Sequence, residues 1–220
     1  MPDPRTPARI FDHSLLLGVA FAWACLSGKI GPLILISLWV FGAWIWRMRG
    51  RYTPSGRFGA ANVITALRFG IALWMAMLSP EARIPGGGVL LMLFFALDGL
   101  DGRLARKSGQ SSDFGATFDM ETDALMTAVS CFVAVEVGVA GVWLLLVGGL
   151  RYVFVLLTSH IGRGPEPPRR WGRWAYSLMV VGLTAALTLP NDFTELVLAL
   201  GGVAVIASFG RSFVWSFFGR

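Results

Sequence analysis

Four carboxylates form two pairs within the segment Asp98–Asp123. Asp98 precedes Asp101 by three residues, and Asp119 precedes Asp123 by four. On a helix, both spacings place the paired side chains on one face, about 5–6 Å apart at Cβ. The segment contains no histidine or cysteine. Its donors are therefore hard oxygens, which suit Mg²⁺, Mn²⁺ or Ca²⁺ rather than zinc.

The acid pairs lie between two apolar runs, GVLLMLFFAL before Asp98 and ALMTAVSCFVAV after Asp123. Carboxylates at the edge of a membrane are costly unless they are paired or bind a cation, and they are therefore expected to be functional. Arg106 follows in the same segment, and nearby glycines leave room for a bulky ligand. This combination predicts a phosphate-bearing substrate whose charge is shared by a metal ion and Arg106. We interpret Asp113 and Glu121 differently, as acids that cap helix ends in the headgroup zone.

The composition indicates a helical membrane protein. Of the 220 residues, 55% are hydrophobic and 15% are charged, and the mean hydropathy is +0.64. The net charge of +6 forms no continuous basic stripe, which argues against binding of nucleic acid. Cys25 and Cys131 lie in apolar runs and are too few for a disulfide scaffold. Neither His13 nor His160 has a partner at metal-ligand spacing.

The apolar runs predict an all-α polytopic bundle of about eight spans. The predicted spans are 14–27, 30–46, 61–79, 87–106, 116–136, 139–160, 172–190 and 193–211. The first run resembles a signal peptide, but a second follows almost at once, so we expect an uncleaved helical hairpin. The basic, Gly- and Pro-broken linker 47–60 separates an N-terminal hairpin, 1–50, from a six-helix domain, 51–220.

The basic residues predict the orientation. Most of the 19 Lys and Arg residues fall on one side of an eight-span topology, and only Lys29 and Arg83 fall on the other. The positive-inside rule therefore predicts that both termini and the acid segment face the cytoplasm. Arg68 and Arg151 fall within spans, and Arg151 lies so deep in its span that it needs an anion. Glu136 is an isolated acid near the outer end of its span, for which the sequence gives no role.

The acid segment resembles the signature of the CDP-alcohol phosphatidyltransferases, D-x-x-D-G-x-x-A-R followed after eight residues by G-x-x-x-D-x-x-x-D. Every fixed position matches: Asp98, Asp101, Gly102, Ala105, Arg106, Gly115, Asp119 and Asp123. The family similarly begins its first core helix with P-N-x-x-T-x-x-R. Here Asn62, Thr65 and Arg68 match, whereas Ala61 replaces the proline. That loss is expected to affect only the entry into the helix. The resemblance covers about residues 55–215.

The resemblance implies transfer of a phosphatidyl group from CDP-diacylglycerol to an alcohol, with release of CMP. Asp98, Asp101, Asp119 and Asp123 would hold two divalent ions, Mg²⁺ or Mn²⁺, and Asp123 would also act as the base. The nucleotide would contact six residues: Asn62, Thr65, Gly102, Ala105, Arg106 and Gly115. The acceptor pocket is predicted from arginines, namely Arg68, Arg151, Arg169, Arg170 and Arg173. For Arg151, pairing with a core acid or snorkelling is the alternative.

The predicted acceptor is glycerol 3-phosphate, with inositol phosphate, serine or another alcohol as alternatives. The other partners expected are membrane lipids and a second copy of the chain in a homodimer, and the expected location is a bacterial inner membrane. A divalent-cation transporter is the alternative from another class, because intramembrane carboxylates are expected there too. It is disfavoured because the four acids gather at one place instead of following several spans.

Overall fold

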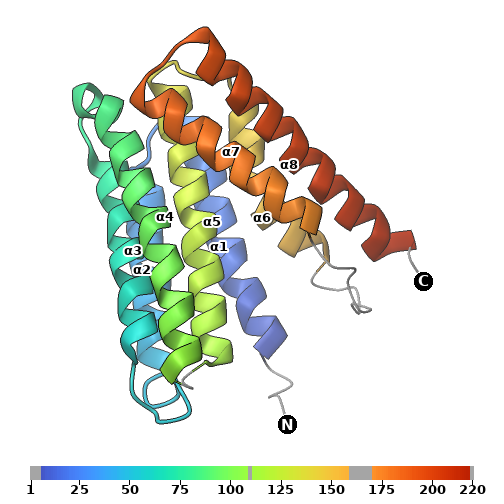
Figure 1. The fold of residues 1–220 in the computed structure, drawn as a ribbon. Helices are drawn as coiled ribbons and strands as arrows, with labels where there is room; N and C mark the ends of the chain where they lie inside the picture. Colours follow the sequence, from blue (N-terminus) through green and yellow to red (C-terminus); the bar gives the residue numbers. More distant parts are fainter. Residues whose placement is uncertain (1–5, 109–110, 159–169, 219–220) are drawn as a thin grey trace.

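The computed structural model describes residues 6–108, 111–158 and 170–218, and the regular structure in these ranges is helical (Figure 1). The helices are α1 (Thr6–Ser27), α2 (Gly31–Arg47), α3 (Ala60–Met77), α4 (Arg83–Ser108), α5 (Asp113–Glu136), α6 (Trp143–Thr158), α7 (Arg170–Thr188) and α8 (Asp192–Phe218), with a short 3₁₀ helix η1 (Pro80–Ala82) before α4. The predicted all-α bundle is confirmed, and each helix overlaps one predicted span.

Successive helices run in opposite directions, so the start of α1 and the end of α8 lie toward the same end of the bundle (Figure 1). The end of α4 and the start of α5 lie at this end too, which brings the acid segment there. This arrangement agrees with an even number of crossings. That this end faces the cytoplasm stays a prediction.

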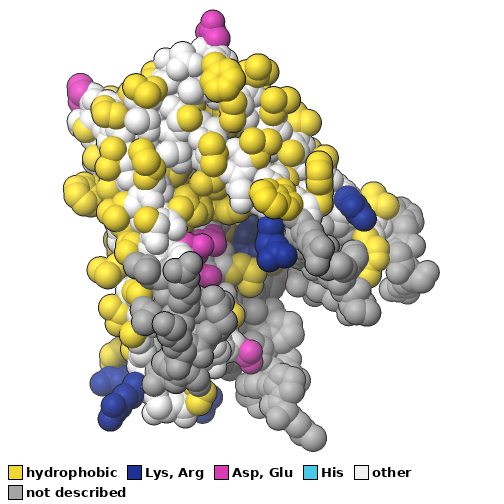
Figure 2. All heavy atoms as spheres, in the orientation of Figure 1, with side chains coloured by type: hydrophobic (Ala, Val, Ile, Leu, Met, Phe, Trp, Pro, Cys, Tyr) yellow, Lys and Arg dark blue, Asp and Glu magenta, His cyan; other side chains and the backbone are white. Residues whose placement is uncertain are grey.

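The outer surface of the bundle suits lipid. In the described part of the chain, three helical stretches are long and apolar enough to cross a membrane: Ala60–Met77, Pro80–Gly99 and Asp192–Trp215. Large hydrophobic side chains such as Trp39, Trp74 and Val203 are exposed. Hydrophobic side chains cover much of the face seen in Figure 2. The carboxylates of the acid segment thus belong to a helical membrane protein with an apolar outer surface.

The ends of α5, the helix that carries the second acid pair, are defined by local chemistry. At its start, the Ser112 side chain caps the helix by accepting a hydrogen bond from the backbone N–H of Gly115 (3.0 Å), and it also donates to the carbonyl of Tyr52 (2.5 Å). At its end, Gly138 adopts φ 76°, and the N–H of Val139 bonds the carbonyl of Ala134 at 3.0 Å. This is a Schellman motif, which terminates the helix.

Close backbone contacts join the helices. In the α7–α8 pair, a Cβ at Gly201 would lie 2.5 Å from Met179 Cα, and one at Gly182 would lie 2.7 Å from Leu198 Cα. Small residues at such contacts are typical of helices packed in a membrane. The N-terminal hairpin also packs on the core, because a Cβ at Gly18 of α1 would lie 2.9 Å from Tyr152 Cβ of α6. The division into two domains at residue 50 stays a prediction.

Candidate active site

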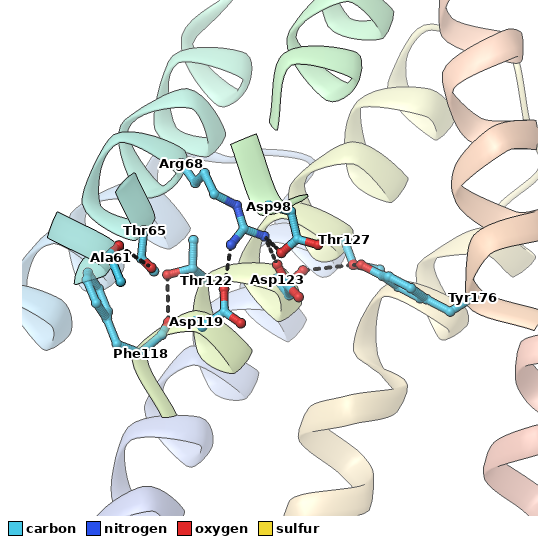
Figure 3. Close-up of polar contacts among 10 residues, drawn as sticks. All are labelled: Ala61, Thr65, Arg68, Asp98, Phe118, Asp119, Thr122, Asp123, Thr127 and Tyr176. Carbon is cyan, nitrogen blue, oxygen red and sulfur yellow. Dashed lines mark hydrogen bonds and ion pairs between the residues drawn. The ribbon is translucent and has the colours of Figure 1, made fainter. Parts of the chain in front are cut away.

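Three helices bring three carboxylates to one arginine. Asp98 comes from α4, Asp119 and Asp123 come from α5, and Arg68 comes from α3. Arg68 Nη2 lies 2.7 Å from Asp98 Oδ1, and the guanidinium is also ion-paired with Asp119 and Asp123 (Figure 3). We call these four residues the acid cluster.

Arg68 is fixed from behind by packing. Its side chain is fully buried, and its guanidinium lies 4.4 Å from the ring centroid of Phe94. Phe94 precedes Asp98 by one turn of α4, so one face of that helix supplies both the ring and the carboxylate. The contact is a cation–π interaction, which helps a desolvated guanidinium to stay charged. Within the acid cluster, Arg68 is thus buried, while all three carboxylates remain partly exposed.

The acid cluster fits a divalent cation. One oxygen from each of Asp98, Asp119 and Asp123 can be chosen so that all three lie within 4.8 Å of one another. Carboxylate oxygens are the donors that Mg²⁺ and Mn²⁺ prefer. Three carboxylates facing one guanidinium leave negative charge in excess, which a cation would neutralise. Asp101 lies on α4, but its side chain is outside the described residues, so the first predicted acid pair is described only at Asp98.

Two predicted nucleotide contacts are brought together beside the acid cluster. Asn62 of α3 is buried and donates from Nδ2 to the carbonyl of Phe58 (2.6 Å). A Cβ added at Gly115 of α5 would lie 2.8 Å from Asn62 Oδ1, so only glycine allows this approach. Thr65, one turn further along α3, is also buried and bonds the carbonyl of Ala61. The side chains at the other predicted contacts, Gly102, Ala105 and Arg106, lie outside the described residues.

Comparison with known proteins decides the family. The sequence model described as CDP-alcohol phosphatidyltransferase matches residues 58–211, which begin just before α3 and end within α8. The chain belongs to this family. The matched region contains the whole acid cluster, and the hairpin of α1 and α2 lies outside it. The resemblance inferred from the acid segment is thereby confirmed.

Two relatives are similar to parts of the chain. Cholinephosphotransferase 1 of Bos taurus is 27% identical over 130 residues, which cover 58% of this chain and 28% of that protein. The CDP-diacylglycerol–glycerol-3-phosphate 3-phosphatidyltransferase of Treponema pallidum (strain Nichols) is 39% identical over 91 residues, which cover 34% of this chain and 42% of that protein. The matches thus span less than half of each relative. No solved structure matches the chain.

In this member of the family, α7 contributes a residue that the sequence analysis missed. The hydroxyl of Tyr176 lies 3.1 Å from Thr127 Oγ1, and Thr127 in turn donates to the backbone carbonyl of Asp123 (2.8 Å) (Figure 3). Because Thr127 donates to that carbonyl, Tyr176 is the donor in their contact. Thr127 could have been found from its spacing, one turn beyond Asp123. Tyr176 carries no such signal, because its position depends on how α7 packs.

The opposite face of α5 holds a second ion pair, between Glu121 and Arg151 of α6. Glu121 is only 1% exposed and also accepts a hydrogen bond from Ser14 of α1 (3.0 Å). The prediction that Glu121 caps a helix end is therefore wrong, because its carboxylate lies inside the bundle. Asp113 is exposed in the first turn of α5, but the side chain that caps this helix end is that of Ser112. The partner that Arg151 requires is thus a core acid, the alternative considered above.

Of the other arginines predicted to bind the acceptor, the structure describes the side chain of Arg173 alone. Arg173 is exposed near the start of α7, while Arg169 and the Arg170 side chain lie outside the described residues.

At the far end of α5, Glu136 pairs with Arg83 (2.5 Å), which is buried. Glu136 therefore has a partner that the sequence did not identify, and the pair joins the start of α4 to the end of α5.

Proposed function

We propose that the chain transfers a phosphatidyl group from CDP-diacylglycerol to the hydroxyl of a small phosphorylated alcohol, releasing CMP, in phospholipid synthesis. The observation that carries this proposal is the acid cluster. Its carboxylates belong to the family's signature positions and carry more negative charge than Arg68 balances. A site of this kind suits a reaction that cleaves a diphosphate linkage, with CMP as the leaving group.

Asp98, Asp119 and Asp123, together with Asp101, would hold the metal, and we propose two ions, Mg²⁺ or Mn²⁺. When bound, the ions would supply neutralisation of the diphosphate and of the departing CMP. The charge of Arg68 sits on the inner side of the three carboxylates, so it would hold them in place while their exposed side faces the substrate. Asn62, Thr65 and Gly115 would receive the nucleotide.

Asp123 would act as the general base. The acceptor's O–H proton would move to the Asp123 carboxylate, the acceptor oxygen would form a bond to the phosphorus that carries the diacylglycerol, and the bond from that phosphorus to CMP would break. Tyr176 and Thr127 lie at the same edge of the acid cluster and would orient the acceptor hydroxyl.

We propose glycerol 3-phosphate as the acceptor. The name of the Treponema pallidum relative includes this acceptor, and Arg169, Arg170 and Arg173, of which Arg173 is exposed on α7, would bind its phosphate. The name of the bovine relative points instead to transfer of a cholinephosphate group, so the experiment must test the donor as well as the acceptor. Inositol phosphate, serine or another alcohol would use the same chemistry. The proposed setting is a bacterial inner membrane, with the active site facing the cytoplasm and the chain forming a homodimer.

A headgroup screen tests the function. The purified full-length chain is supplied with CDP-diacylglycerol, Mg²⁺ or Mn²⁺, and one acceptor at a time, and the release of CMP is followed. We expect CMP with glycerol 3-phosphate, none without an acceptor, and none after chelation until a divalent ion is restored. CMP with choline or serine alone would change the acceptor. No CMP with any alcohol would contradict the transferase assignment and favour the cation transporter.

A further inference from the structure

The Glu121–Arg151 pair lies on the back of the helix that carries Asp119 and Asp123. Glu121 is two residues from each of them, which is about 200° around a helix of 3.6 residues per turn. Asp119 and Asp123 therefore face Arg68, while Glu121 faces α1 and α6. Within a few residues, α5 thus presents acids on two opposite faces. One face contacts α3 through Arg68, and the other contacts α1 and α6.

Three helices converge on Glu121. Its Oε1 accepts from Ser14 Oγ of α1 and pairs with Arg151 Nη2 of α6. Ser14 and Glu121 are both 1% exposed, so the contact is deep in the bundle. The N-terminal hairpin lies outside the region matched by the family model. Through Ser14 it nevertheless supplies a hydrogen-bond donor to α5, the helix that carries Asp119 and Asp123.

Tight packing around the pair limits how α1, α5 and α6 can move. A Cβ at Gly18 of α1 would lie 2.9 Å from Tyr152 Cβ, and a Cβ at Gly148 of α6 would lie 3.0 Å from both Phe21 of α1 and Cys131 of α5. The three helices are thus in contact through residues that leave no room for a side chain. A change in the position of α1 would be transmitted to α5.

The pair is poorly suited to a purely stabilising role. Glu121 Oε2, Arg151 Nε and Tyr152 Oη are buried and have no hydrogen-bond partner among the described residues. A buried ion pair with unsatisfied atoms stabilises a fold weakly, and an apolar pair of the same size often does better. What such a pair can supply is specificity, because only one orientation of α5 brings Glu121 to both Ser14 and Arg151.

We propose that Glu121 and Arg151 are positioning residues, which together with Ser14 of the hairpin fix the rotation of α5 and so the placement of Asp119 and Asp123. The inference rests on the proposed function, in which these two carboxylates hold the metal. A side-chain tip lies about 5–6 Å from a helix axis, so rotating α5 by about 20° would move each carboxylate by roughly 2 Å. Metal–ligand distances tolerate only about ±0.2 Å.

The test compares the two ion pairs that glutamates of α5 form, Glu121 with Arg151 and Glu136 with Arg83. Glu121→Gln removes the charge on the face of α5 behind the acid cluster, and Glu136→Gln removes the charge of the pair with Arg83 near the end of the same helix. In the full-length protein, Mn²⁺ affinity is measured by electron paramagnetic resonance with CMP present, alongside kcat and both KM values. We expect Glu121→Gln to weaken Mn²⁺ binding about 10- to 100-fold, the loss typical of residues that orient metal ligands. Glu136→Gln should leave it unchanged at a similar loss of thermal stability.

Two further comparisons guard against simple misfolding. The charge-swapped double variant, Glu121→Arg with Arg151→Glu, should recover part of the Mn²⁺ affinity that Glu121→Gln loses. Gly18→Leu should weaken Mn²⁺ binding by forcing α1 away from α6, whereas Gly42→Leu in the same hairpin should not, because a Cβ at Gly42 meets nothing within 4 Å. Ser14→Ala removes only the hydrogen bond from α1 to Glu121 and keeps the ion pair with Arg151, so it should weaken Mn²⁺ binding less than Glu121→Gln does.

Each outcome bears on the proposal. Equal Mn²⁺ affinity in Glu121→Gln and Glu136→Gln would overturn it. A higher acceptor KM in an Arg151→Gln variant, with Mn²⁺ affinity unchanged, would also overturn it and make Arg151 a direct ligand of the acceptor phosphate. Failure of the proposed function is visible separately. In that case the wild type would bind Mn²⁺ but release no CMP, and the metal titration would still measure the positioning.

Discussion

Arg68 and Arg151 pair with acids on opposite faces of α5, and the two sites differ in which partner is buried. In the acid cluster, Arg68 is fully buried and its three carboxylate partners are 31–43% exposed. In the pair on the back of the helix, the carboxylate of Glu121 is 2% exposed and Arg151 is 23% exposed. The first presents negative charge toward the outside of the bundle, and the second encloses it.

The acid cluster and the Glu121–Arg151 pair also differ in net charge. One guanidinium cannot neutralise three carboxylates, so the acid cluster is left with negative charge that a mobile cation can reach. Glu121 and Arg151 balance each other, so their pair needs no further ion. The same residue types, less than one helical turn apart, are therefore suited to a chemical role on one face and a positioning role on the other. The predictions below separate these roles, in order of expected effect.

Asp123→Asn breaks the acid cluster at the proposed base. The amide keeps the shape and one oxygen but cannot take a proton, so CMP release should fall about 10²- to 10⁴-fold. Binding of CDP-diacylglycerol should be nearly retained. The matched control is Asp113→Asn, which changes an exposed acid at the start of the same helix. Near-normal turnover of Asp123→Asn at saturating metal would show that another group is the base.

Arg68→Gln and Arg151→Gln remove one guanidinium from each cluster. Both variants leave carboxylates unpaired, and without metal each should lose about 3–5 kcal/mol of unfolding free energy. Mg²⁺ should stabilise Arg68→Gln more than it stabilises the wild type, because the ion replaces charge among the same carboxylates. For Arg151→Gln, the gain with Mg²⁺ should be no larger than in the wild type. Thermal unfolding in chelator and in Mg²⁺ measures the difference, and equal gains would end the distinction between the clusters.

Gly115→Ala tests the nucleotide side of the acid cluster. The added Cβ would meet Asn62 Oδ1 at 2.8 Å, and Asn62 is held by its bond to Phe58, so the amide must move. Loss of one hydrogen bond to the nucleotide corresponds to about a tenfold rise in the KM for CDP-diacylglycerol. Gly70→Ala on α3 is the control, since a Cβ there meets nothing within 4 Å. An unchanged KM would place the nucleotide elsewhere.

Tyr176→Phe removes the hydroxyl that donates to Thr127 at the edge of the acid cluster. The lost bond is worth about 0.5–1.5 kcal/mol, so kcat/KM for the acceptor should fall roughly two- to tenfold. The KM for CDP-diacylglycerol should not change. Tyr52→Phe is the matched control, because Tyr52 lies in the linker after α2 and its hydroxyl donates to the carbonyl of Ile45 within α2, away from the acid cluster. Equal effects of the two variants would exclude a role for Tyr176 at the acceptor.

The sequence alone determined the parts of this protein that depend on local chemistry. Apolar runs of the right length predicted the eight helices, and the i,i+4 spacing placed Asp119 and Asp123 on one face of α5. The spacing of the acid segment was also specific enough to indicate the family. These properties could be predicted because helix periodicity and capping are set by residues within a few positions of one another.

Only the tertiary structure decided which charges meet. Arg68 and Arg151 were both predicted to bind the acceptor phosphate, yet one lies among three carboxylates and the other pairs with Glu121. Glu121 looked like an acid at a helix end because the sequence shows its polar neighbours but not the helices packed behind it. Ser14 and Tyr176 reach α5 from α1 and α7, far away in the chain. Such contacts depend on how helices pack and rotate against one another, and no local spacing encodes that arrangement.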